Sequence, residues 1–296
     1  MDTSSQNSPA QENLKPMRVI AITSGKGGVG KSNMVVNLGI SYAQAGRKVL
    51  IIDGDLGLGN QDVLLDETPQ YTLQHVLAGE QPIENVLLRS RFGVTVLPAT
   101  SGVAEMESLS EEDRMRLLYA IEGVGDVFDT VLIDTAAGIG SNALFFASAA
   151  QELAVVVTPE PTSLADAYAM IKLLSLRCGL KRISIIVNQA ASQTEATEIF
   201  RRLSTITARF LPTMLELVGI VPLDGKLREA VRLQRPVVTL FPQAKASRAI
   251  QEIATGLLMR PTSNLGTTGR IQLFWQRLLQ TGPAMESPDS QAGGAQ

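Results

Sequence analysis

The 296-residue sequence contains a single cysteine, Cys178, and a single histidine, His75. One cysteine cannot close a disulfide within the chain, and a structural zinc site needs about four Cys or His ligands. The sequence therefore excludes a disulfide scaffold and a Cys/His zinc domain. We expect Cys178 to pack at the end of a helix and His75 to be an ordinary helix-surface residue.

Long apolar runs are also missing. No stretch reaches the roughly 18 apolar residues of a membrane-spanning helix, and residues 1–16 lack the basic start and apolar core of a signal peptide. The net charge of −3 argues against a protein that coats nucleic acid through bulk charge. These absences predict a cytoplasmic protein with no direct nucleic-acid contact.

Apolar runs alternate with helix-length segments along the chain, and 45% of the residues are hydrophobic. The predicted strands are 18–23, 48–53, 93–98, 129–134, 153–158, 183–188 and 215–220, and the predicted helices include 30–45, 110–122, 162–177, 194–209 and 244–258. Most of these strands are continuously apolar, which is typical of strands covered on both faces. We predict an α/β fold, a doubly wound and mainly parallel sheet with helices on both faces, whose ligands bind at the carboxyl ends of the strands.

Two polar tails flank this region. Residues 1–16 and 260–296 are rich in Ser, Pro, Gly, Asn and Gln, and they are predicted to be flexible. One folded domain is predicted between them, over residues 17–259.

The first predicted strand leads into SGKGGVGKSN and then into a helix. Gly25, Gly30, Lys31 and Ser32 fit the phosphate-binding pattern G-x-x-x-x-G-K-[ST] in its required strand–loop–helix setting. Backbone N–H groups and the helix N-terminus then face the phosphates, Lys31 reaches the β- and γ-phosphates, and the Ser32 hydroxyl ligates Mg²⁺. The predicted nucleotide-binding residues of this segment are Gly25, Lys26, Gly27, Gly28, Val29, Gly30, Lys31, Ser32 and Asn33.

Two further strands end in aspartate. Asp53 and Asp55 follow the strand 48–53, and Asp134 ends the strand 129–134 ahead of Gly138. Carboxylates beside a phosphate loop can orient Mg²⁺-bound water or the attacking water, so we predict Ser32, Asp53, Asp55 and Asp134 as the metal-site residues. The Gly138 backbone is predicted to sense the γ-phosphate. On composition alone, Asp53 to Asp55 could equally form an Asp-Gly turn.

The loop KGGVGKS, with its additional Lys26, resembles the deviant Walker A motif of the MinD/ParA family of P-loop ATPases. The resemblance implies a weak regulatory ATPase that forms a homodimer on binding ATP, with Lys26 reaching the partner's nucleotide. It also implies that Asp55 is the switch I residue tied to hydrolysis, so the predicted catalytic residues are Lys26, Lys31 and Asp55.

The base site is predicted by the same resemblance, which places Asn188 against adenine and Pro222 at the border of the base pocket. A strand-end turn is an equal reading of Asn188 from sequence alone. The resemblance also implies that the nucleotide is ATP, and the absence of an Asn-Lys-x-Asp guanine-reading motif from the sequence agrees with this.

Within this family, residues 17–259 are most similar to the flagellar-number regulators FlhG, also called FleN. Asn33 after the Walker serine, DGDLGLGNQDVLL, DTAAGIG and TPEPTSLADAYAMIK carry this likeness. It implies control of flagellar number and placement, with the GTPase FlhF, a flagellar enhancer-binding transcription activator and basal-body components as partners. The N-terminal tail has no clear copy of the D-Q-A-x-x-L-R element with which such proteins activate FlhF, so stimulation of FlhF does not follow.

The sequence leaves two alternatives open. A MinD-type protein would position the division site, and a ParA-type protein would segregate DNA or cargo by means of an exposed basic patch. Arg201, Arg202 and Arg209 lie on one predicted helix and are the candidates for that patch.

The C-terminal tail contains an apolar island, GRIQLFWQRLLQTG, predicted to form an amphipathic helix over 270–281. Its apolar face, at helical spacing, consists of Ile271, Phe274, Trp275, Leu278 and Leu279. Such a helix suits the lipid headgroup boundary, and the resemblance implies a membrane-targeting sequence here. The alternative is a helix docked permanently on the ATPase body. One copy should bind weakly and two copies in a dimer more tightly, which predicts peripheral association with the inner face of the cell membrane in the ATP form.

Overall fold

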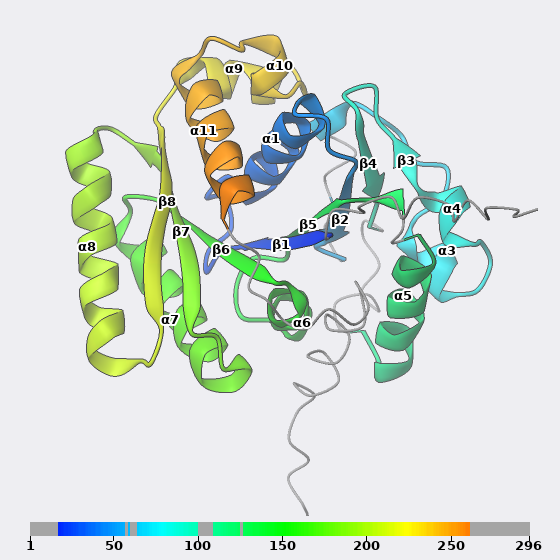
Figure 1. Ribbon diagram of the computed structural model, residues 1–296, viewed down its shortest axis with the longest axis horizontal. Coiled ribbons are helices and arrows are strands. Elements are labelled where there is room, and N and C mark those ends of the chain that lie inside the picture. Colours follow the sequence, from blue (N-terminus) through cyan, green and yellow to red (C-terminus); the bar gives the residue numbers. More distant parts are fainter. Residues whose placement is uncertain (1–16, 57–58, 60–63, 100–108, 125–126, 261–296) are drawn as a thin grey trace, which may run out of the picture.

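The computed structural model describes residues 17–56, 59, 64–99, 109–124 and 127–260. These residues form an eight-stranded sheet in the order β3-β4-β2-β5-β1-β6-β7-β8 (Figure 1). The strands in that order are β3 (Leu88–Arg89), β4 (Val94–Leu97), β2 (Val49–Gly54), β5 (Thr130–Thr135), β1 (Arg18–Thr23), β6 (Glu152–Val157), β7 (Arg182–Ala190) and β8 (Met214–Pro222). All neighbours are parallel except β3 and β4, which confirms the predicted α/β fold and mainly parallel sheet.

The seven predicted strands all form, and the additional strand is the short β3 at the sheet edge. Every residue of β1, β2 and β5 is buried. Their continuous apolar sequences are explained by helices covering both faces of the sheet. β3 has only two residues, which is too short for a periodic signal.

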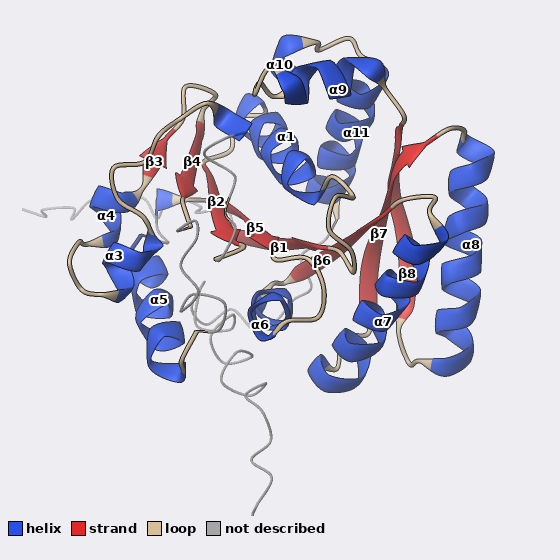
Figure 2. Ribbon diagram, turned by 180° about the vertical axis from the view of Figure 1, so that it is seen from behind, coloured by secondary structure: helices blue, strands red, loops and turns tan. Residues whose placement is uncertain are grey.

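The helices form one layer on each face of the sheet (Figure 2). Their bounds are α1 (Lys31–Gln44), α3 (Leu73–Leu77), α4 (Ile83–Val86), α5 (Glu111–Val124), α6 (Ser141–Ala149), α7 (Pro161–Cys178), α8 (Gln193–Phe210), α9 (Gly225–Arg232), α10 (Val237–Leu240) and α11 (Lys245–Met259). Apolar side chains of α1, α10 and α11 build the core on one face, and those of α3 to α8 build the core on the other. The five helices predicted by range correspond to α1, α5, α7, α8 and α11.

The single cysteine lies at the end of a helix and the single histidine lies in a helix, as expected from the sequence. Cys178 is the last residue of α7 and is half-buried. His75 lies in the short helix α3, where its Nδ1 accepts a hydrogen bond from the Thr72 backbone N–H at 3.1 Å and helps cap the helix. Neither residue belongs to a group of three or more His, Cys, Asp or Glu side chains that could hold a metal ion in the described part of the chain.

Over the described ranges, no helix is both long and apolar enough to cross a bilayer. The predicted tail 1–16 and the predicted amphipathic helix 270–281, with its apolar face, lie outside the described residues. Their assignments therefore stay predictions.

Candidate nucleotide-binding site

The predicted phosphate loop connects β1 to the N-terminus of α1. Gly30 is the N-cap of α1, with a φ of 90°, and no side chain caps the helix. The first N–H groups of a helix have no partner within it, and α1 has no acidic residue in its first turn that would repel an anion. A Cβ added at Gly27 or Gly28 would meet nothing within 4 Å, so the backbone is open on that side. The loop thus has the features of a phosphate cradle.

Gly25 fixes the other end of this loop against α7. A Cβ at Gly25 would lie 2.2 Å from the carbonyl carbon of Asp166, so only glycine allows this approach. The loop is also tied to the segment after β5, because the Gly138 N–H donates to the Ser24 carbonyl at 2.9 Å. Gly138, the residue predicted to sense the γ-phosphate, thus lies beside the phosphate loop.

Lys31 and Asp134 form a buried ion pair. Lys31 Nζ lies 2.5 Å from Asp134 Oδ1, and the two side chains are 7% and 0% exposed. In the β2–β5 register Asp134 is directly opposite Asp53, which is also buried and accepts a hydrogen bond from the Asp55 N–H at 3.2 Å. The fold therefore brings the three predicted aspartates together at the carboxyl ends of two neighbouring strands, next to the start of α1 and Ser32.

These carboxylates do not form a metal site by themselves. Within the described ranges no three His, Cys, Asp or Glu side chains are grouped closely enough to hold an ion. Mg²⁺ in nucleotide sites typically uses one or two carboxylates together with phosphate oxygens and water. Ser32, Asp53, Asp55 and Asp134 fit that partial protein contribution.

Lys26 has different surroundings from Lys31. Its Nζ lies 2.7 Å from Glu160 Oε2 and 3.0 Å from Thr162 Oγ1, at the start of α7. The side chains of Lys26 and Glu160 are 38% and 62% exposed. Sequence reasoning missed Glu160 and Thr162, which are far from Lys26 along the chain.

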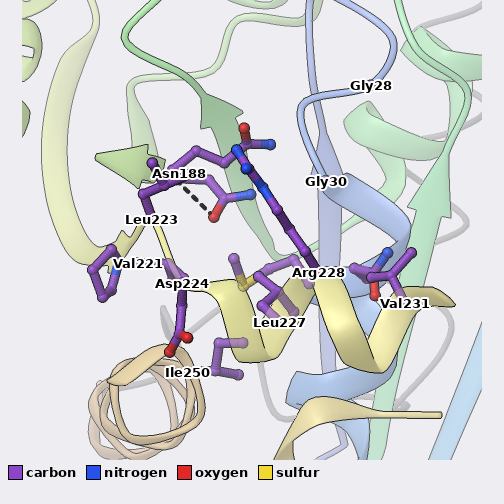
Figure 3. Close-up of a pocket in the computed structure, with 14 residues that line it drawn as sticks. Gly28, Gly30, Asn188, Val221, Leu223, Asp224, Leu227, Arg228, Val231 and Ile250 are labelled. Carbon is purple, nitrogen blue, oxygen red and sulfur yellow. Dashed lines mark hydrogen bonds between the residues drawn. The ribbon is translucent and has the colours of Figure 1, made fainter. Parts of the chain in front are cut away.

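A pocket of about 270 Å³ extends from the phosphate loop toward α9 (Figure 3). Asn188 and Pro222, the two residues predicted for the base site, both lie on its wall, together with Gly28, Gly30 and Asn33 of the loop. The lining residues not predicted from the sequence are Met34, Gln189, Val221, Leu223, Asp224, Leu227, Arg228, Val231 and Ile250. A mostly apolar wall with a few polar groups suits a flat aromatic base. The helical spacing of Leu227 and Val231 is the signal by which part of this wall could have been found.

Asp224 shapes that wall by capping two helices. Its Oδ1 accepts from the Lys226 N–H at the start of α9, at 2.8 Å, and its Oδ2 accepts from the Ala246 N–H at the start of α11, at 3.0 Å. One side chain therefore fixes α9 and α11, two of the helices that line the pocket.

The arginines predicted as candidates for a basic patch lie on α8, where a single glutamate pairs with two of them. Arg201 and Arg202 both hydrogen-bond to Glu198, and these bonds lower the pKa of Glu198 to about 2. The Arg209 guanidinium lies 5.3 Å from the centre of the Phe210 ring. With three arginines and two glutamates, α8 carries a net charge of +1.

Comparison with known proteins agrees with this geometry. The family profile described as AAA domain matches residues 17–181. The chain is 43% identical to the antiactivator FleN of Pseudomonas aeruginosa over 267 residues, covering 90% of this chain and 95% of FleN. It is 31% identical to the flagellum site-determining protein YlxH of Helicobacter pylori, covering 91% and 92% of the two chains.

The similar solved structures include cell-division proteins of the MinD type. MinD of Pyrococcus horikoshii, complexed with Mg-ADP, matches with a TM-score of 0.65 and 26% identity, covering 81% of this chain and 96% of that one. MinD of Aquifex aeolicus, in a MinC:MinD complex, matches with a TM-score of 0.64 and 32% identity, covering 82% and 96%. The sheet order, the phosphate loop with its two lysines and these relatives together establish that the chain belongs to the MinD/ParA family of P-loop ATPases, on the branch that includes FleN and YlxH.

Proposed function

We propose that the protein is an ATP-operated dimerisation switch that hydrolyses ATP slowly and regulates flagellar number or placement. The observation that carries the switch is the contrast between the two lysines of one loop. Lys31 is buried against Asp134, whereas Lys26 is partly exposed and paired with an exposed glutamate. A lysine on the outer side of a phosphate loop can reach a nucleotide held by a second copy of the chain.

The residues around the proposed nucleotide site would then divide between holding the phosphates, holding Mg²⁺ and orienting water. Lys31 would hold the β- and γ-phosphates, and Asp134 would hold a water of the Mg²⁺ shell. Ser32 would ligate Mg²⁺, which supplies charge neutralisation on the phosphates when it is bound. Asp53 would support the water shell, and Asp55 would orient the attacking water.

Lys26 completes the site in the dimer. Charge builds up on the transferring phosphoryl group, and a lysine contributed by the partner would stabilise it as an arginine finger does. Releasing Lys26 from Glu160 costs little, because exposed ion pairs contribute about 0–1 kcal/mol. Lys26 can therefore give up its contact with Glu160 for a contact with the partner's nucleotide at little cost in free energy.

The membrane and flagellar parts of the proposal come from the sequence of the tail and from the relatives. Two copies of the 270–281 helix in one dimer would bind the inner face of the membrane more tightly than one copy. The name of YlxH, a flagellum site-determining protein, supports a flagellar role, and the name of FleN, an antiactivator, supports an enhancer-binding transcription activator as a candidate partner. FlhF and basal-body components are further candidate partners. Division-site positioning of the MinD kind is the second candidate, supported by the MinD structures.

Dimerisation can be tested by light scattering with Mg²⁺ and a non-hydrolysable ATP analogue. We expect a dimer for the wild type and a monomer for Lys26→Ala that still binds the analogue. Lys48→Ala is the matched control and should dimerise, because Lys48 is exposed and lies just before β2, at the amino ends of the strands and away from the phosphate loop. A wild-type protein that stays monomeric when loaded would overturn the switch.

Membrane binding is tested by sedimenting the protein with anionic liposomes. Trp275→Glu should abolish ATP-dependent sedimentation while leaving analogue binding intact. Unchanged sedimentation would instead favour a tail docked permanently on the ATPase body.

A further inference from the structure

Asn188 lies where the base pocket meets the phosphate loop. It is the seventh residue of β7, and its side chain is 3% exposed. Its Nδ2 donates a hydrogen bond to the Val29 carbonyl oxygen at 2.8 Å, which joins β7 to the residue just before the N-cap of α1. Asn188 therefore touches both halves of the proposed site.

The amide is held in a fixed orientation. Its Oδ1 accepts from the Gln189 N–H at 2.9 Å, seen as the dashed line in Figure 3. Gln189 has a φ of 58°, and the β7–β8 register is irregular between Asn188 and Ala190. Because the Gln189 N–H holds Oδ1, Nδ2 is the end of the amide that faces Val29.

Gly30 shows how closely the loop is fitted to this amide. A Cβ at Gly30 would lie 2.5 Å from Asn188 Nδ2, and the φ of 90° at Gly30 is itself a glycine conformation. Asn188 thus contacts the loop at the two residues that precede α1, where the phosphate-binding N–H groups begin.

An asparagine amide has two N–H donors and two acceptor lone pairs. The contacts to Val29 and Gln189 use one of each. One donor and one lone pair remain on a side chain that lines the base pocket. A single amide can therefore hold the loop and contact a base at the same time.

We infer that Asn188 is a positioning residue for the phosphate loop, which it holds in its phosphate-binding conformation whether or not a base is bound. Adenine contact and loop position are then coupled through one side chain. This inference rests on the proposed nucleotide site, but it predicts an effect that a base contact alone does not: loss of the amide weakens binding of a phosphate chain that carries no base.

The test compares Mg²⁺-tripolyphosphate with Mg²⁺-ATP as ligands, by calorimetry on the full chain. Asn188→Ala should weaken tripolyphosphate binding roughly 3- to 30-fold, the loss of about one buried hydrogen bond, and should weaken ATP binding at least as much. Leu223→Ala is the matched control, because Leu223 lines the pocket, is exposed and carries no charge that would attract a phosphate chain. It should change ATP affinity only. Unchanged tripolyphosphate affinity in Asn188→Ala, with ATP binding lost, would make Asn188 a base contact alone and overturn the inference.

Hydrogen exchange of the nucleotide-free protein gives a second readout. Asn188→Ala should speed exchange in residues 25–33 and leave the central strand 49–54 unchanged, whereas a general loss of stability would speed both. Asn188→Asp, nearly the same size, places a carboxylate oxygen against the Val29 carbonyl and should speed loop exchange further. If residues 25–33 of both variants exchanged at the wild-type rate, the inference would also be overturned. If the wild-type protein failed to bind Mg²⁺-ATP, the proposed function would be overturned instead.

Discussion

Replacing Lys31 by alanine should destabilise the protein even when no nucleotide is present. Lys31 is 7% exposed and its ammonium group lies 2.5 Å from the fully buried Asp134 carboxylate. Removing one partner of a buried pair leaves a charge in a poorly solvated place, which typically costs about 3–5 kcal/mol. Asp134 has further interactions that soften this loss, so we expect about 3 kcal/mol.

The expected shift in melting temperature is then about 6–12 °C, at roughly 2–4 °C per kcal/mol for a domain of this size. The other loop lysine provides an internal comparison. Lys26 and Glu160 are both substantially exposed, so Lys26→Ala should change the free energy of unfolding by no more than about 1 kcal/mol. The two substitutions delete the same side chain from the same loop and differ chiefly in burial.

Urea unfolding of nucleotide-stripped protein measures both effects, since a bound nucleotide would stabilise the folded state and mask the difference. Adding Asp134→Asn to Lys31→Ala removes the uncompensated charge, and it should restore much of the lost stability. The reasoning is refuted if Lys31→Ala costs under about 1 kcal/mol, or if the double variant is as unstable as the sum of its single changes.

Three other expectations concern single residues. Asp55→Ala should slow phosphate release by about 100-fold or more and leave a long-lived ATP dimer; normal turnover would remove the role given to that carboxylate. Gly25→Ala should cost about 1–3 kcal/mol and weaken nucleotide binding, because its Cβ would lie 2.2 Å from the Asp166 backbone; Gly27→Ala, with open space around its Cβ, should melt like the wild type. Burial raises the pKa of the Cys178 thiol, and the charge of Arg177 opposes this with a smaller effect. The folded protein therefore contains less of the reactive thiolate at pH 8 than the unfolded chain does. Iodoacetamide should label Cys178 more slowly in the folded protein than in the urea-unfolded protein. Equal labelling rates would show that this thiol is not desolvated.

The sheet and the phosphate loop were predictable because their signals are local. Strands buried on both faces have continuous apolar sequences, and such strands indicate a parallel sheet. In a parallel sheet Asp53 and Asp134 lie at the carboxyl ends of the strands, where the loop also lies. The glycine pattern likewise indicated a backbone open to phosphate, and Gly28 and Gly30 have the positive φ values that such a loop requires.

What the sequence did not predict depends on contacts between distant segments. Glu160, the partner of Lys26, is separated from it by 134 residues, and nothing in the local sequence pairs them. The same holds for the bond from Asn188 to Val29, across 159 residues. From sequence, Asn188 could be read either as an adenine contact or as a strand-end turn. Its position at an irregular strand end on the pocket wall is compatible with both interpretations. Neither interpretation predicted the hydrogen bond from Asn188 to the loop.

The different burial of the two loop pairs suggests an order of events for the proposed switch. The Lys31–Asp134 pair is shielded from solvent, so it should open only when phosphate and Mg²⁺ replace both partners. The Lys26–Glu160 pair is exposed and weak, so a partner's nucleotide can displace it at little cost. Nucleotide binding should therefore precede dimerisation, and salt should affect the two steps differently, because screening acts mainly on exposed charges. If raising the salt concentration weakened nucleotide binding and dimerisation equally, the separate roles given to Lys31 and Lys26 would be wrong.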